Sequence, residues 1–414
     1  MYETFYHNLP NGVQIVHRKT TSPVVYVGLM IGAGTRHELP NENGMAHYIE
    51  HCLFKGTQHY TARQIINHIE GIGGEINAYT TKEETTFYAA TLRQHFRTTL
   101  HLLADMVLRP TFNKKETDKE VTVILDEIES YNDSPSELIY DDFENMIFDG
   151  SSLAMPILGT KKTLRRISKS PNYPLQWMAE HYRPERFVLF VLGNVTTKHV
   201  ISAAEKEFGN TEVPINNTTL HNTKQYYTTL NNTKSRTYRR HTHQTHIMLG
   251  SHTYHIGHTK QLTMFLLNNI LGGGSMSSRL YLSLREKHGL VYNIDSQTVP
   301  LSDTGYWNIY LACEPQHKDQ CLELCHKELQ TLRDVRLTSS QLQRALRQLE
   351  GQLAISAENQ ENNALAMAKQ MLYHHRAPQW QETFAKVQQI TPAQLQDVAN
   401  EVFAPEKIYT LLYD

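Results

Sequence analysis

Short runs of apolar residues, rich in β-branched side chains, predict several strands near the N-terminus. Asn11-Gly12 lies between two of these runs, and this pair supplies the positive φ angles that a tight hairpin turn needs. A third run is continuously apolar, which predicts a central strand that is buried on both faces. In chain order the predicted strands cover 4–7, 13–16, 24–31, 76–79 and 85–91.

Between and after these strands, apolar residues recur at three- and four-residue spacing, which is the spacing of one helix face. Strands and helices are mixed without a regular strand–helix alternation, and this mixture predicts an α+β fold. The predicted helices cover 45–54, 61–71, 96–108 and 116–131.

An internal repeat divides the chain into two similar parts. Residues 171–189 and 392–410 each begin with a proline, continue into a helical segment, and end with an aromatic residue, a Pro-acidic-basic triplet and an apolar strand. The offset is constant, since 392 − 171 and 405 − 184 both equal 221. This repeat indicates two similar α/β domains of about 200 residues each. We place them at 1–212 and 236–414, joined by an Asn/Thr-rich linker at 213–235.

Charge and composition exclude several classes of partner. The 414 residues include 40 Lys and Arg against 42 Asp and Glu, a net charge of −2, so we expect no nucleic-acid or membrane partner. No apolar run approaches the length of about 18 residues that spans a bilayer, and the N-terminus has no signal-peptide or presequence pattern. Four cysteines without a CxxC pair predict buried thiols. Together these features predict a cytoplasmic protein.

The chain has 23 histidines, and two of them stand in a metal-binding pattern. The segment His47–His51 (HYIEH) lies within the first predicted helix, where residues four apart point to one face. Two such histidines can bind one Zn²⁺, while Glu50 between them reaches a metal-bound water instead of the metal. This H-x-x-E-H order is the motif of the inverted zincins.

A third ligand is expected from the predicted helix 116–131. Glu120 and Glu127 are two helical turns apart and lie beside an apolar stripe, where an unpaired carboxylate is unfavourable. A metal ion is one partner that would satisfy them, and a solvated acidic face is the alternative.

These motifs together resemble peptidase family M16, the pitrilysin-type zinc metallopeptidases. His47–His51 is followed by Cys52–Thr57 (CLFKGT), by Gly73–Thr80 (GGEINAYT), and then by Glu120 and Glu127. The combination is most similar to the short-chain branch of the family, which contains the processing peptidases and their bacterial relatives.

The resemblance implies one Zn²⁺ per chain, bound by His47, His51 and Glu127. In the family, a characteristic number of residues separates the second histidine of the motif from the last ligand. Glu127 matches this last ligand, since it follows His51 by 127 − 51 = 76 residues. Glu120 then matches the family's supporting carboxylate behind the ligands.

The resemblance also implies substrate contacts in both halves of the chain. Asn77 and Ala78 match a strand whose open edge pairs with an extended peptide. Residues 271–292 match the second-domain signature, in which Arg285 and Tyr292 hold the substrate backbone and polarise the scissile carbonyl. The glycines of this segment do not continue into a phosphate-binding pattern, so we expect no nucleotide site.

We therefore expect a zinc-dependent endopeptidase that cleaves unfolded peptides or presequence-like segments. Zinc makes hydroxide available at neutral pH, and Glu50 is expected to act as the general base that takes the proton of the attacking water. Arg285 and Tyr292 are expected to stabilise the developing oxyanion. Peptide degradation and presequence processing are equally compatible with the sequence.

Two alternative functions are compatible with the same features. The fold also resembles core subunits of respiratory complexes, which predicts a non-catalytic scaffold without zinc, and a histidine-rich metal buffer would bind several ions per chain.

The chain has the length of one half of the fused family members, yet it carries both the zinc motif and the Arg285/Tyr292 pair. The resemblance therefore implies a homodimer whose active sites are shared between subunits.

Overall fold

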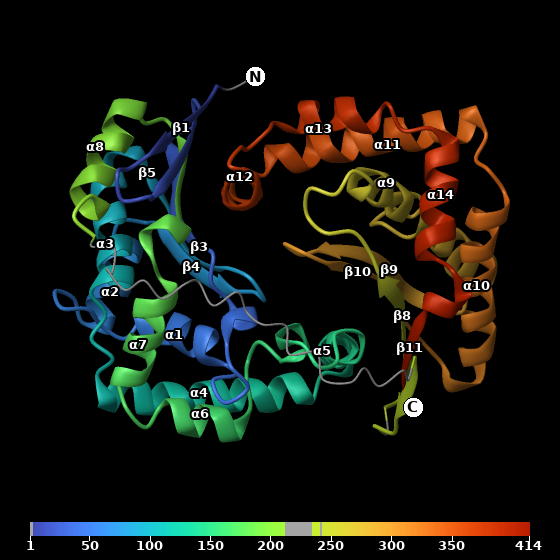
Figure 1. Ribbon diagram of the computed structural model, residues 1–414, viewed down its shortest axis with the longest axis horizontal. Helices are drawn as coiled ribbons and strands as arrows, with labels where there is room; N and C mark the ends of the chain where they lie inside the picture. Colours follow the sequence, from blue (N-terminus) through green and yellow to red (C-terminus); the bar gives the residue numbers. More distant parts are fainter. Residues whose placement is uncertain (1–2, 212–233, 241) are drawn as a thin grey trace. The chain divides into compact units, whose positions relative to one another are not determined.

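Two mixed sheets organise the protein, and each belongs to its own compact unit. The computed structural model describes residues 3–211, 234–240 and 242–414 (Figure 1). Unit 1 comprises Met1–Ser130, Gly150–Tyr227 and Ala357–Pro378, and unit 2 comprises Tyr131–Asp149, Thr228–Ser356 and Gln379–Asp414.

The sheet of unit 1 has six strands in the order β1-β2-β6-β3-β5-β4, antiparallel except for the parallel pair β2–β6. β1 and β2 form the predicted hairpin, and Gly12 in its turn adopts a φ of 97°. In chain order the strands are β1 (Thr4–Asn8), β2 (Gln14–Lys19), β3 (Val24–Ile31), β4 (Glu75–Thr80), β5 (Thr85–Leu92) and β6 (Phe187–Gly193).

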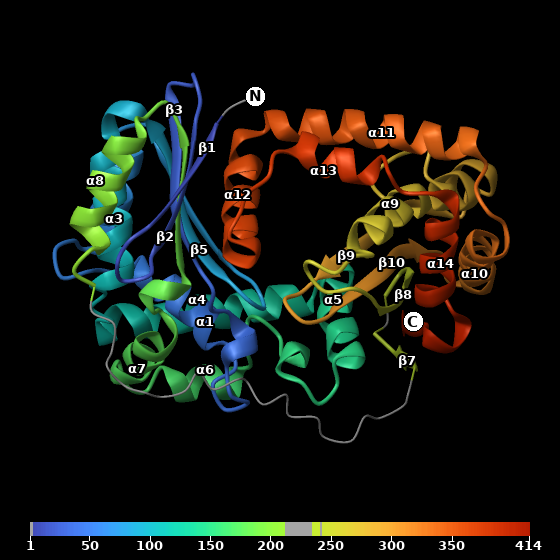
Figure 2. The same cartoon turned by 45° about the horizontal axis from the view of Figure 1, so that its top comes forward.

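Both faces of this sheet are covered. Alternate residues of a strand point to opposite faces, so Val27 and Leu189 join the larger core on one face, whereas Met30 and Phe190 pack against α12 on the other. Figure 2 shows α12 on the side of the sheet opposite α3 and α8. Burial on both faces explains why 24–31 is continuously apolar. The helices of unit 1 are α1 (Met45–Leu53), α2 (Ala62–Glu70), α3 (Phe96–Leu108), α4 (Lys114–Asn132), α6 (Lys161–Ile167), α7 (Asn172–His181), α8 (Thr197–Phe208) and α12 (Gln360–His374).

The sheet of unit 2 has five strands in the order β7-β11-β8-β10-β9, with β7–β11 as its parallel pair. One core joins this sheet to α9, α10, α11, α13 and α14, and α5 packs against β8 and β11. The elements are α5 (Pro135–Ile147), β7 (Ser235–Tyr238), β8 (Thr245–His252), α9 (Gln261–Leu271), β9 (Val291–Pro300), β10 (Gly305–Cys313), α10 (Lys318–Asp334), α11 (Ser339–Glu358), α13 (Trp380–Val387), α14 (Pro392–Val402) and β11 (Tyr409–Tyr413).

The internal repeat of the sequence corresponds to a structural repeat. α7 leads through a short turn at Pro184 into β6, and α14 leads through a matching turn at Pro405 into β11. β6 pairs in parallel with β2 and antiparallel with β3, and β11 pairs in parallel with β7 and antiparallel with β8. The two units therefore share a topology, as the repeat predicted.

The compact units are not the continuous segments 1–212 and 236–414. Residues 131–149, which contain α5, belong to unit 2, and residues 357–378, which contain α12, belong to unit 1. Each sheet thus receives one helix from the other half of the sequence. Residues 212–233, most of the predicted linker, lie outside the described residues.

Two predictions made from the composition can be compared with the structure. Among the described residues, no helix is both long enough and apolar enough to cross a membrane. All four cysteines are free and buried, as predicted.

His17 on β2 is a buried histidine that the fold keeps neutral. It is 1% exposed, its Nδ1 lies 3.0 Å from the hydroxyl of Thr197, and its Nε2 has no hydrogen-bond partner among the described residues. Burial, and to a smaller extent the charge of Lys19, lowers the pKa of His17 from 6.5 to about 4. Protonation would leave a buried N–H donor without an acceptor.

We predict that His17 makes unit 1 less stable as the pH falls from about 7.5 to about 4.5. Below pH 6.5, the pKa of His17 in the unfolded chain, the unfolded state binds a proton at His17, whereas the folded state binds one only near pH 4. The free energy of unfolding therefore decreases by about 2 to 3 kcal/mol over this pH range. Urea unfolding of the wild type and of His17→Gln at both pH values measures the difference. The variant should lose less stability on acidification by that amount, and equal losses would contradict the assignment.

Candidate metal centre

Helix α1 carries three of the predicted site residues. Its N-cap is Gly44, whose φ of 92° is readily adopted only by glycine, and the helix runs to Leu53. The apolar side chains of α1 are buried in the core of unit 1, which fixes the rotation of the helix about its axis. As a result, the rings of His47 and His51 lie side by side with 4.5 Å between their centroids.

The buried side chain of Glu38, which the sequence did not reveal, holds the start of α1. Glu38 is 3% exposed and accepts hydrogen bonds from the backbone N–H groups of Gly44 at 2.8 Å and Ala46 at 2.7 Å, and from the Asn43 amide at 3.2 Å. The first N–H groups of a helix lack partners within the helix and attract negative charge. Burial raises the pKa of Glu38 to about 8, although these hydrogen bonds oppose the rise. The role of Glu38 could have been predicted from one feature of the sequence: an acidic residue lies shortly before a helix that starts at glycine.

Glu127 on α4 faces the two imidazoles. Its Oε2 lies 3.8 Å from His47 Nε2 and 3.5 Å from His51 Nε2. One ligand atom from each of the three residues lies within 4.8 Å of the other two, and the described residues contain no second group of this kind. Tetrahedral zinc, with bonds near 2.0 Å, separates its ligand atoms by about 3.3 Å. Two imidazole nitrogens and one carboxylate oxygen at these distances fit a zinc ion.

His47 is kept in the form that binds a metal. Burial, and then the neighbouring His51, lowers the pKa of His47 to about 3, so the imidazole stays neutral. Its Nδ1 has no hydrogen-bond partner within the described part of the chain, so packing holds this side of the ring.

Glu120 lies behind His51 and sets its orientation. Glu120 Oε1 lies 2.8 Å from His51 Nδ1, and Glu120 Oε2 lies 2.7 Å from the ammonium of Lys55. Burial would raise the pKa of Glu120, but the hydrogen bonds from His51 and Lys55 outweigh burial and lower it. Burial would likewise lower the pKa of His51, but the hydrogen bond to Glu120 and the surrounding carboxylates raise it. An ionised Glu120 that accepts from Nδ1–H leaves the Nε2 lone pair of His51 for a metal.

Glu50 lies between the two histidines on α1 and is held by the last residue of β4. The Thr80 hydroxyl donates a hydrogen bond of 2.6 Å to Glu50 Oε2. Burial raises the pKa of Glu50, while the Thr80 hydrogen bond and the charge of His51 oppose the rise. Thr80 belongs to the segment that carried the family resemblance, but its contact with Glu50 could not be read from the spacing.

The predicted substrate strand is an edge strand. Asn77 pairs with Tyr88 and Ala78 with Phe87 in the β4–β5 ladder, and β4 has no other strand partner in the described ranges. Ala78 packs against the core that contains α1, on the same face as Thr80, whereas Asn77 points to the opposite face. The free edge of β4 can therefore pair with an extended peptide.

Arg285 and Tyr292 belong to unit 2, whereas the candidate metal donors belong to unit 1. Arg285 lies in the π-helical segment η5 (Tyr281–Lys287), with its guanidinium 4.8 Å from the ring centroid of Tyr281 and 5.0 Å from that of Tyr292. Tyr292 lies near the start of β9 and is 76% exposed. The structure therefore pairs these two side chains with each other, next to an edge strand of the second sheet.

Known protein families match both halves of the chain. Residues 14–161 match the family model described as insulinase (peptidase family M16), and residues 175–349 match the model described as the peptidase M16 inactive domain. All three candidate metal donors, Glu50 and Glu120 fall within the first match, which agrees with the word "inactive" in the second description.

Full-length relatives give the same result. The chain is 33% identical over 403 residues to YmxG of Bacillus subtilis (strain 168), named an uncharacterized zinc protease, and the match covers 97% of this chain and 96% of that protein. It is 30% identical over 381 residues to an uncharacterized zinc protease of Rickettsia bellii (strain RML369-C), covering 92% and 90%. A crystal structure of a protease from Helicobacter pylori has the same fold, with a TM-score of 0.90, 19% identity and full coverage of both chains. The chain therefore belongs to peptidase family M16.

Proposed function

We propose that this protein is a zinc-dependent endopeptidase that cleaves extended, unfolded peptides or presequence-like segments. The convergence of His47, His51 and Glu127 beside Glu50 is the observation that carries the proposal. The names of the relatives as zinc proteases support zinc as the metal, and we propose one ion per chain. The free, buried cysteines support a reducing compartment, the cytoplasm.

When bound, zinc supplies a Lewis acid that polarises a carbonyl and acidifies water. Glu50 takes the proton of the attacking water and later gives it to the leaving amine. Glu120 keeps His51 in the tautomer whose Nε2 faces the metal position. The free edge of β4 binds the peptide backbone, so recognition depends on an extended conformation more than on particular side chains.

We also propose that the protein is a homodimer in which Arg285 and Tyr292 of one subunit contact the peptide at the metal of the other. The exposure of Tyr292 supports this role, because a tyrosine that packed in the core of unit 2 would be unavailable to a substrate. The cation–π contact of Arg285 with Tyr292 would orient both groups toward a carbonyl oxygen.

Replacement of Glu50 by Gln should remove catalysis and leave the metal in place. The amide cannot accept the proton of water, so we expect kcat to fall by about 10² to 10⁴-fold on a peptide-library substrate. Zinc content should equal that of the wild type, because the three donors are unchanged. Glu70→Gln, the same chemical change at the exposed end of α2, is the control. Cleavage by Glu50→Gln at the wild-type rate would overturn the mechanism.

Elemental analysis of protein purified without chelator should find about one zinc per chain. Glu127→Gln should lose the ion, whereas Asp126→Asn, its exposed neighbour, should keep it. Glu120→Gln should weaken zinc binding by about 10- to 100-fold in a chelator competition, because it supports a ligand without being one. A wild type without zinc would favour the scaffold function, and several ions per chain would favour a metal buffer.

Mixing two inactive variants tests the shared active site. After subunit exchange, a mixed dimer of Glu50→Gln and Tyr292→Phe should hold one site with both changes and one with neither. Activity should recover to about a quarter to a half of the wild type. No recovery despite proven exchange would place both groups of each site in one subunit.

A further inference from the structure

We propose that Thr80 is a positioning residue for Glu50, and that helix α12 fixes Thr80 through the buried turn between β4 and β5. The inference rests on the proposed function, because it takes Glu50 as the general base. It assigns to α12, which comes from the C-terminal half of the sequence, a part in the chemistry of unit 1.

The Thr80 hydroxyl has one proton to donate, and it donates it to Glu50 Oε2 at 2.6 Å. This contact occupies one carboxylate oxygen and leaves Oε1 to exchange a proton. Threonine suits this place because its branched β-carbon restricts χ1 and keeps the hydroxyl pointing in one direction. A glutamate without such a contact has three free torsions, so its carboxylate would spend less time in the productive orientation.

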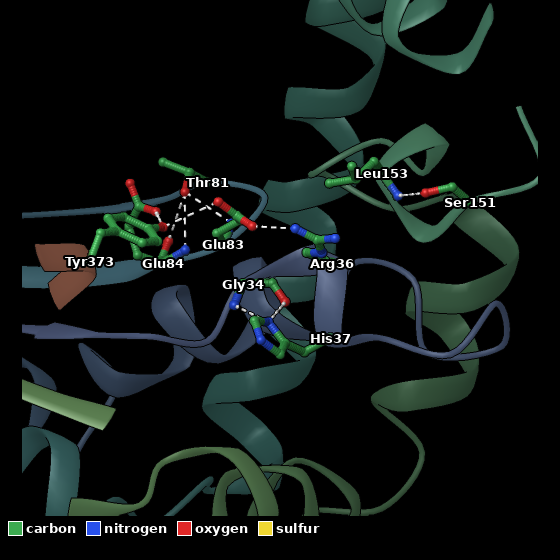
Figure 3. Close-up of polar contacts among 9 residues, drawn as sticks. All are labelled: Gly34, Arg36, His37, Thr81, Glu83, Glu84, Ser151, Leu153 and Tyr373. Atoms are coloured by element: carbon green, nitrogen blue, oxygen red, sulfur yellow. Dashed lines mark hydrogen bonds and ion pairs between the residues drawn. The ribbon is translucent and has the colours of Figure 1, made fainter. Parts of the chain in front are cut away.

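The position of Thr80 depends on the turn that follows it. Thr80 pairs with Thr85, and the Thr81 N–H donates to Glu84 O at 2.8 Å across the turn. The Thr81 hydroxyl accepts the N–H groups of Glu83 at 3.2 Å and Glu84 at 3.1 Å (Figure 3). These bonds make the turn a rigid continuation of the strand.

The backbone of the turn is also tied to the loop before α1. The N–H of Thr35 donates to Thr81 O at 3.2 Å, and the N–H of Arg36 donates to Lys82 O at 2.7 Å. A β-carbon at Gly34 would lie 2.4 Å from Thr81 O, so only glycine permits this close approach. The turn therefore has a fixed place relative to the segment that leads into the metal-binding helix.

Two buried carboxylates attach the turn to α12. Glu83 is 6% exposed and forms an ion pair with Arg36, and Glu84 is 1% exposed (Figure 3). On α12, Lys369 Nζ lies 2.7 Å from Glu84 Oε1, and the Tyr373 hydroxyl donates to Glu84 Oε2 at 2.6 Å. Adjacent buried carboxylates repel each other and are unfavourable unless both are paired. α12 supplies partners for the Glu84 carboxylate and thereby adds a second attachment to the backbone bonds that already hold the turn.

Replacing the Thr80 hydroxyl tests the first step. Thr80→Val keeps the shape and removes the donor, so kcat should fall about 10- to 100-fold, as for the loss of a hydrogen bond to a charged group. KM, zinc content and the unfolding midpoint should stay at wild-type values, and Thr80→Ser should restore most of kcat. Thr91→Val, which removes a buried hydroxyl contact on β5 to Thr99, is the control.

Replacing the α12 donor tests the second step. Tyr373→Phe should lower kcat with unchanged zinc content, and the double variant with Thr80→Val should be no slower than Thr80→Val alone. Tyr6→Phe is the matched control, because it removes a hydroxyl that contacts Ala377 from β1, at the opposite edge of the sheet. If Tyr373→Phe does not fold, Lys369→Gln replaces it in the same cycle.

Three results would overturn the inference. Wild-type kcat in Thr80→Val would show that Glu50 needs no such contact, and a change in KM alone would make Thr80 a substrate contact instead. Additive effects of Tyr373→Phe and Thr80→Val would show that α12 does not act through Thr80. The proposed function fails separately, if Glu50→Gln stays active, so an inactive Glu50→Gln with a fully active Thr80→Val rejects only the inference.

Discussion

The requirement that buried acidic side chains be paired shapes the candidate metal centre. Glu120 is buried, and its two partners, His51 and Lys55, both come from the C-terminal end of α1 or just beyond it. Glu38 is buried at the other end and accepts the first free N–H groups of the same helix. α1 is therefore held at both ends by buried glutamate side chains, and these attachments add to the apolar packing that fixes the position of His47 between them.

The exchange of helices between the halves of the sequence is a second consequence of burial. The central strands of unit 1 are apolar on both faces, so the face opposite α1 needs a cover, and α12 provides it. In unit 2, α5 packs against β8 and β11, and Gly250 leaves room for the ring of Phe143. Each sheet is thus completed by the other half of the chain. The same exchange brings Lys369 to Glu84, 285 positions away in sequence, so one helix serves both packing and polar pairing.

Local geometry explains why much of the site was visible in the sequence. Residues four apart on any helix share a face, so the H-x-x-E-H order already placed His47 and His51 together once α1 was predicted. The continuously apolar segment 24–31 predicted a strand with two buried faces, and the structure contains that strand. Glu127 was selected by its distance from His51 in a family pattern, and the structure brings its carboxylate to both imidazoles.

The elements of the first 131 residues, the repeat and the candidate metal donors could be predicted from the sequence alone, because these depend on periodicity and on short, characteristic spacings. The contacts of Glu38 with α1 and of Thr80 with Glu50, and the exchange of α5 and α12 between the units, could be found only in the folded structure. Each of these contacts joins groups from different elements, and α12 reaches its partners across hundreds of positions. The pattern of apolar residues records which face of an element is buried, but it does not record which distant element covers that face or supplies the hydrogen-bond partner of a buried polar group.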